Sequence, residues 1–113
     1  MKTSDVSIDP KERALLEAKA GVLKALAHPT RLYMAERLSA GEMCVCEFAE
    51  ILDADVSTVS RHLSVLKAAH IVEAEKRGKQ VFYSLKVPCV LNFMGCVEEV
   101  LKTSAEERSA LVK

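Results

Sequence analysis

The sequence predicts a mainly α-helical domain with one small β-hairpin, in the order α-α-α-α-β-β-α. Apolar residues recur at helical spacing across residues 11–69, and the period becomes that of β-strands between residues 71 and 85. A basic turn that contains a glycine joins the two strand segments, and a helical pattern returns after Pro88. Together these observations predict a winged helix-turn-helix.

The chain of 113 residues is long enough for one domain. We expect residues 1–10 to form a flexible tail, residues 11–103 to fold, and residues 104–113 to form a tail or a helix extension. Residues 1–10 are polar and no apolar run approaches ~18 residues, so neither a signal peptide nor a membrane span is expected. A cytoplasmic protein with four reduced cysteines is therefore expected.

The net charge of zero hides an uneven distribution. Between Val56 and Lys86 there are six Lys or Arg residues and two Glu residues, so this segment carries +4 and the remainder −4. A basic segment of this kind favours nucleic acid as a partner.

The first two helices are expected at Lys11–Ala27 and from Pro29 to Gly41. Proline suits the first position of a helix, and glycine suits the position that follows its end. The first helix has two adjacent apolar stripes, so we expect it to be buried on more than one side, as in a helix that also meets another subunit. The stripes consist of Leu15, Val22 and Leu26, and of Leu16, Ala20 and Leu23.

Two further helices joined by a three-residue turn form the predicted helix-turn-helix, with Asp55 as the N-cap of the second. After them the pattern indicates two strands and a last helix, which the C-terminal tail prolongs or leaves frayed. These expected elements are helices Cys44–Leu52 and Val56–Ala69, strands Ile71–Glu75 and Gln80–Leu85 around a turn at Lys76–Lys79, and a helix from Pro88 to about Leu101.

The second helix of the pair has one apolar side and one side without any acid. Its apolar residues are Val56, Val59, Leu63 and Leu66. Short hydroxyls and one arginine on the opposite side suit entry into a DNA major groove, whereas the alternative is a plain solvated helix. The expected DNA-binding residues are Ser57, Thr58, Ser60, Arg61, His62, Ser64 and Lys67 on this helix, and Lys76, Arg77 and Lys79 at the hairpin turn. For His62, packing at the margin of the core is the alternative to a phosphate contact.

The stretches LKALAHPTRLYMAERL, CVCEFAEIL, STVSRHLSVLKAAHIV and GKQVFYSL resemble the ArsR/SmtB family of metalloregulatory repressors, from Leu23 to Leu85. The resemblance implies a homodimer joined through its first and last helices, bound to double-stranded operator DNA with an inverted repeat. The sequence departs from the family at His70, where glycine is usual. His70 is therefore expected in a left-handed conformation at some cost, or in a local role that the sequence does not identify.

Cys44 and Cys46 stand at the start of a predicted helix. The stretch EMCVCEF resembles the family's metal box, usually ELCVCDL, which is associated with arsenite, antimonite, cadmium and lead. Side chains at i and i+2 point about 200° apart on a regular helix, so the two sulfurs converge only where a helix begins or is distorted. A helix start is also expected to lower the thiol pKa. The alternative is that each cysteine packs as a small hydrophobic residue.

The third ligand of such a site is open, because Ala49 stands where the arsenite-type pattern usually has another cysteine. Cys89 and Cys96 lie about 10 Å apart on the predicted last helix, too far for a disulfide. We expect one or both to approach Cys44 and Cys46, within the chain or across the dimer, with packing in the dimer interface as the alternative. The family's zinc site on the last helix is not expected, because this helix has no histidine.

These observations predict a repressor that leaves its operator when cysteine thiolates bind arsenite or antimonite. The alternatives are another thiophilic metal, such as cadmium or lead, or a redox or persulfide signal through the same cysteines. An enzyme is not expected, because no Ser/His/Asp set, glycine-rich phosphate loop or paired carboxylates are found.

Overall fold

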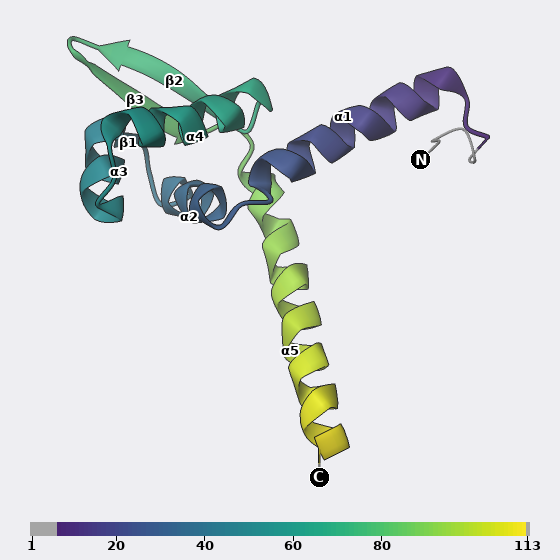
Figure 1. Ribbon diagram of the computed structural model, residues 1–113. Helices are drawn as coiled ribbons and strands as arrows, with labels where there is room; N and C mark the ends of the chain where they lie inside the picture. Colours follow the sequence, from purple (N-terminus) through teal and green to yellow (C-terminus); the bar gives the residue numbers. More distant parts are fainter. Residues whose placement is uncertain (1–6, 113) are drawn as a thin grey trace.

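The computed structural model describes residues 7–112 and confirms the winged helix-turn-helix (Figure 1). Among the described residues, no helix is long and apolar enough to cross a bilayer. The elements are α1 (Pro10–Leu26), α2 (Pro29–Leu38), β1 (Met43–Cys44), α3 (Val45–Leu52), α4 (Val56–Ala68), β2 (Val72–Arg77), β3 (Gln80–Leu85), the 3-10 helix η2 (Pro88–Leu91) and α5 (Asn92–Val112).

The core lies where α2, α3, α4 and the sheet meet. Helical spacing of apolar residues puts three side chains of α4 on the inward face, against Phe48 of α3 and Met34 of α2. The largest fully buried side chains are Phe48, Met34, Leu63, Leu66, Val59 and Val72. This small core fixes α4 across the neighbouring helices, so its other side faces outward.

The hairpin is part of a three-stranded antiparallel sheet with strand order β1-β3-β2. The sequence did not predict β1, because two residues are too few to show the alternation of a strand. In β1, Met43 pairs with Tyr83 and Cys44 pairs with Phe82. The segment before α3 is therefore tied to the wing.

Helices α1 and α5 diverge from this core and leave most of their length unpacked (Figure 1). The radius of gyration is 17.8 Å, whereas a compact chain of this length has about 13 Å. In α1 only Ala25 and Leu26 are buried, so its two apolar stripes are largely not covered by this chain. Large apolar side chains exposed on these helices are Leu15, Leu16, Leu23, Phe93, Val100 and Leu101.

Several predicted boundaries were wrong by a few residues. Helix α2 ends at Leu38, and Gly41, with φ 150°, lies in the turn that follows. Strand β2 runs through Arg77, so the hairpin turn is only Gly78 and Lys79, with Gly78 at φ 63°. A 3-10 turn precedes α5, and α5 continues through residues 104–112, which are therefore a helix extension. The first six residues of the expected tail lie outside the described part of the chain.

His70 follows the C-cap of α4, Ala69, and has φ 64°, the left-handed conformation that was expected. The N–H of Ile71 donates to the carbonyl of Leu66, and the N–H of His70 donates to the carbonyl of Lys67, both at 3.0 Å. These bonds form a Schellman motif, whose left-handed position normally favours glycine. His70 thus ends the helix in a backbone conformation that its Cβ atom opposes.

We expect His70→Gly to raise the free energy of unfolding by about 1 kcal/mol, because removal of the left-handed strain outweighs the added freedom of glycine in the unfolded chain. Urea unfolding at fixed protein concentration measures the change. His70→Ala is the matched control, since alanine keeps the strain, and an equal gain in both variants would contradict this explanation.

Candidate nucleic-acid interface and thiol site

The turn between α3 and α4 orients the outward face of α4. Asp53 has φ 51°, and the N–H of Ala54 donates to the carbonyl of Ala49 at 3.0 Å, which closes the end of α3. Asp55 is the N-cap of α4, as predicted, although its side chain makes no capping hydrogen bond. The backbone of this turn, rather than a side-chain cap, directs α4.

The side of α4 opposite the core carries the polar residues that the sequence predicts. Ser57, Arg61, Ser64 and Lys67 are exposed, and Thr58 and Ser60 are half-buried. The prediction that Val56 lies on the buried side was wrong, because this first residue of α4 is 56% exposed. The exposed face is acid-free along the whole helix.

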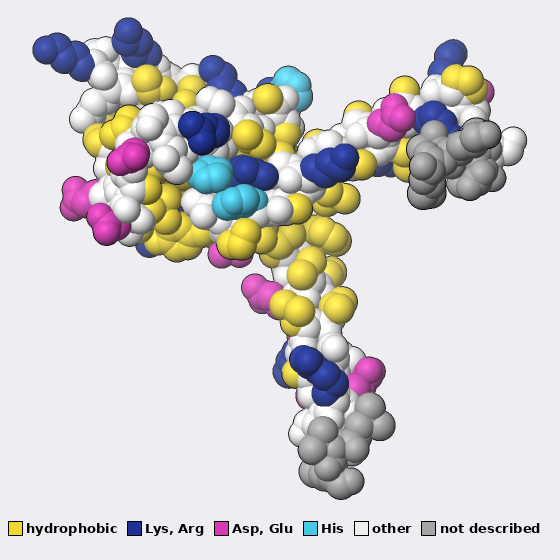
Figure 2. Space-filling view, viewed as in Figure 1, with side chains coloured by type: hydrophobic (Ala, Val, Ile, Leu, Met, Phe, Trp, Pro, Cys, Tyr) yellow, Lys and Arg dark blue, Asp and Glu magenta, His cyan; other side chains and the backbone are white. Residues whose placement is uncertain are grey.

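His62 packs at the junction of three helices. Its ring lies 4.7 Å from the ring of His28, centroid to centroid, and its Nδ1 lies 3.4 Å from Nη1 of Arg31. His28 in turn accepts a hydrogen bond at Nδ1 from the N–H of Thr30 and so caps α2, while Nε of Arg31 donates to the carbonyl of Ala25 in α1. Figure 2 shows two histidine side chains next to each other on the face that it presents. Of the two interpretations of His62, the structure favours packing at the core margin.

The wing presents Lys76 and Lys79 to solvent, and Lys and Arg side chains mark its tip in Figure 2. Arg77 is engaged within the protein: its guanidinium bonds both carboxylate oxygens of Glu42, at 2.5 and 2.9 Å, and one oxygen of Glu75 at 2.7 Å. It also lies 4.7 Å from the ring centre of Phe82. The hydrogen bonds from Arg77 lower the pKa of Glu42. Arg77 therefore differs from the two lysines in having its charge already paired.

The sulfurs of Cys44 and Cys46 lie 2.6 Å apart. Cys44 is the N-cap of α3 with an extended backbone, so its side chain does not follow the helical rotation that would separate the two sulfurs. Its N–H donates to the Glu47 carboxylate at 2.8 Å. The expectation that a helix start allows these two sulfurs to converge is met by this geometry.

The expected lowering of the thiol pKa was wrong for Cys44. The hydrogen bond with Cys46 and burial raise the pKa of Cys44, and they outweigh the lowering by the backbone N–H of Glu47. A helix start thus supplies a favourable N–H, but a buried thiol beside a second sulfur holds its proton more firmly. Cys46 is exposed, and its sulfur accepts a hydrogen bond of 3.8 Å from the side-chain amide of Gln80.

Both thiols open on a groove of about 310 Å³ between α3, α4 and the wing. Sequence reasoning missed the wing residues of this groove, because only the β1–β3 pairing brings them to the cysteines. The groove is lined by Cys44, Val45, Cys46, Val56, Ser60, Lys79, Gln80 and Val81. A ligand on the sulfurs would therefore adjoin the start of α4 and the wing turn.

Cys89 and Cys96 lie in η2 and α5 and are exposed. Among residues 7–112, no three or more His, Cys, Asp or Glu side chains are assembled in a way that could hold a metal ion. Within one chain, neither cysteine completes a site with Cys44 and Cys46. An approach across a dimer stays a prediction.

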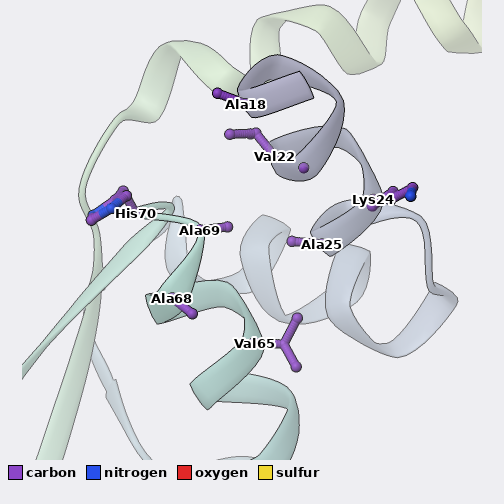
Figure 3. A pocket seen from close by; sticks show the side chains of 9 residues that line it. Ala18, Val22, Lys24, Ala25, Val65, Ala68, Ala69 and His70 are labelled. Carbon is purple, nitrogen blue, oxygen red and sulfur yellow. The ribbon is translucent and has the colours of Figure 1, made fainter. Parts of the chain in front are cut away.

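A second hollow, of about 510 Å³, lies between α1 and the C-terminal end of α4. In Figure 3, Val22 and Ala25 of α1 face Val65 and Ala69, while the side chains of Lys24 and His70 point away from the gap. This hollow is apolar and remote from the thiols, and it continues the uncovered surface of α1.

Residues 28–74 match the family model described as "Bacterial regulatory protein, arsR family". The nodulation protein NolR of Rhizobium meliloti is 31% identical over 108 residues, which are 94% of this chain and 88% of NolR. The cadmium resistance transcriptional regulatory protein CadC of Listeria innocua is 41% identical over 76 residues, 66% of this chain. The match spans 64% of the length of CadC.

Solved structures agree with the fold. The homodimeric winged helix-turn-helix DNA-binding domain Mb0332 from Mycobacterium bovis, described as a possible ArsR-family transcriptional regulator, superposes with a TM-score of 0.75 at 29% identity. That alignment covers 90% of this chain and 94% of Mb0332. NolR from Sinorhizobium fredii gives a TM-score of 0.73 at 29% identity, over 84% of this chain and 95% of NolR. These relatives are not described as enzymes.

The packing of His62 predicts a pH-dependent stability. Burial, followed by the nearby charges of His28, Arg31 and Arg61, lowers the pKa of His62 from its ordinary value of 6.5. Between that lowered pKa and 6.5 the unfolded chain binds a proton that the folded chain does not. Above pH 6.5 neither state binds this proton, so His62 does not make stability depend on pH there. As the pH falls below 6.5, proton binding by the unfolded chain lowers the free energy of unfolding.

We therefore expect the midpoint of thermal unfolding to fall between pH 7.5 and pH 5 more steeply in the native protein than in His62→Gln. Glutamine is the chosen replacement because it does not titrate in this range. Parallel curves for the two proteins would show that His62 does not contribute.

Proposed function

The chain belongs to the ArsR family of bacterial regulatory proteins, and on this basis we propose that it is a DNA-binding transcriptional repressor that leaves its operator when Cys44 and Cys46 bind trivalent arsenic or antimony. The observation that carries the proposal is the groove in which both sulfurs adjoin Ser60 of α4 and Lys79 of the wing. One ligand there reaches both parts of the surface that we assign to DNA.

The DNA contacts are assigned to the exposed face of α4 and to the two free lysines of the wing. We assign to Arg61 a bidentate contact with a guanine edge, and to the serines contacts with phosphates or base edges at short range. Lys76 and Lys79 supply salt-sensitive attraction to the backbone. Arg77 stays in the proposed interface only if DNA displaces Glu42 or Glu75.

We assign α1 and α5 to a homodimer interface. Their exposed apolar side chains and the large radius of gyration support this assignment, as does the homodimeric description of Mb0332. Two copies related by a two-fold axis place two α4 helices on successive turns of the major groove, so the operator is an inverted repeat.

The thiol ligand is assigned from the softness of sulfur, which favours arsenite and antimonite over hard cations. Cys89 or Cys96, from the same or the partner subunit, is the candidate for a third sulfur. Cadmium is the second candidate ligand, favoured by the description of the CadC relative, and lead follows the same chemistry. A persulfide or other redox signal is the third, because the sulfurs of Cys44 and Cys46 are already close.

The recognition helix is tested with Arg61→Ala. We expect this variant to lose operator-specific binding, because each half-site gives up a contact of about 1–3 kcal/mol. Affinity is measured on a duplex selected from a random library by the native protein. Arg108→Ala, which removes the same charge from α5, is the control, and sedimentation confirms that both variants stay dimeric. Unchanged affinity in Arg61→Ala would reject the assignment of α4.

The thiol site is tested by titrating the DNA complex with arsenite under reducing conditions. We expect release in the native protein and about a tenfold or greater rise in the required arsenite concentration for Cys44→Ser and for Cys46→Ser, because each variant loses a soft ligand. Cys89→Ser and Cys96→Ser report on the third sulfur. Release of Cys44→Ser at the native concentration would reject the site, and release by oxidants alone would favour the redox alternative.

A further inference from the structure

The guanidinium group of Arg77 is held by carboxylates of the protein itself. Its Nη1 and Nη2 donate to the two oxygens of Glu42, at 2.5 and 2.9 Å, and its Nη2 and Nε donate to one oxygen of Glu75, at 2.7 and 3.2 Å. The fork on Glu42 has the geometry with which arginine also binds a phosphate. Glu42 therefore occupies the edge of Arg77 that is suited to a DNA phosphate.

The pair formed by Arg77 and Glu42 is open to solvent near the tip of the wing. Arg77 is the last residue of β2, and Lys76 and Lys79 beside it are exposed. The side chains of Arg77 and Glu42 are 44% and 43% exposed, and an ion pair in such a position contributes little free energy in water. A phosphate that the two lysines attract to the wing can therefore displace Glu42.

The two carboxylates differ in how they are attached to the wing. Glu75 lies on the same strand and the same face of the sheet as Arg77, and it pairs across the hairpin with Phe82, whose ring centre lies 4.7 Å from the guanidinium. These two neighbours keep the guanidinium in place when its other partner changes. Glu42 lies 35 positions away, before β1, and belongs to neither strand of the hairpin. A phosphate can thus replace Glu42 without distortion of the hairpin.

We propose that Glu42 competes with DNA phosphate for Arg77, so that it lowers the affinity of the repressor for DNA and makes Arg77 a phosphate contact that forms only on binding. The inference rests on the proposed function, which assigns the wing to DNA. Because a phosphate contact carries no sequence information, the competition weakens binding to the operator and to unrelated DNA by the same factor.

The first test compares Glu42→Gln with Glu73→Gln, which removes the same charge from an exposed position of β2 four residues from Arg77. Affinity is measured for the selected operator duplex and for an unrelated duplex of equal length. We expect Glu42→Gln to bind both duplexes about fivefold or more tightly than the native protein, because neither protomer has to give up the ion pair. Glu73→Gln should change the affinity by less than about twofold, because salt screens a distant exposed charge.

The second test asks whether Arg77 carries the effect. We expect Arg77→Ala to lower the slope of log K against log salt concentration by about 2 in magnitude, because each protomer of the dimer loses one phosphate contact. In a Glu42→Gln/Arg77→Ala double variant, the gain from Glu42→Gln should disappear. A gain that persists without Arg77 would come from the change in net charge alone and would overturn the inference.

A gain in Glu42→Gln no larger than in Glu73→Gln, or an unchanged salt slope in Arg77→Ala, also overturns it. So does a loss of affinity in Glu42→Gln, which would mean that the pair holds the wing in its DNA-binding position. Each of these results leaves the proposed function standing as long as Arg61→Ala still abolishes operator-specific binding. Failure of the native protein to select any duplex overturns both.

Discussion

The pairing of β1 with β3 is the constraint on which the thiol site depends. Cys44 is the last residue of β1, lies opposite Phe82 and is also the N-cap of α3. Because one residue ends a strand and begins a helix, its side chain escapes the helical rotation and meets that of Cys46. The same pairing brings Gln80 and Val81 to the groove. A strand of two residues holds this arrangement with few backbone hydrogen bonds, so a ligand needs little free energy to shift it.

The protein has no net charge, and part of the basic charge of the wing is paired with acidic residues. Arg77 is bound by Glu42, directly before β1, and by Glu75 of its own strand, so part of the basic segment is neutralised in place. Both sides of the Glu42 pair are more than 40% exposed. Such a pair adds little to stability in water, although it links the wing to the segment that carries Cys44.

Much of the fold follows from the sequence, because apolar spacing places Phe48, Val59 and Leu63 inward without knowledge of the partner elements. The outward face of α4 was predicted on the same local grounds, whereas the left-handed His70 was expected from the resemblance to a family in which glycine is usual at this position. What failed depends on contacts between distant segments. No local sequence pattern indicates strand β1 or the position of Gln80 beside the cysteines. Arg77 is paired with Glu42, a residue 35 positions away. The pKa of Cys44 is raised by Cys46 and by burial, which outweigh its position at the start of a helix. Val56 lies on the apolar side of α4 but is 56% exposed at the edge of the groove.

The exposed apolar faces of α1 and α5 have a consequence for how operator occupancy depends on the amount of protein in the cell. If their apolar faces are covered only by a second copy, then assembly scales with the square of the number of chains in the cell at low abundance. Occupancy of the operator would then rise steeply over a narrow range of expression. A chain with so small a core of its own would also be most exposed to proteolysis when scarce. The open architecture would in this way set a lower threshold of synthesis below which transcription proceeds unchecked.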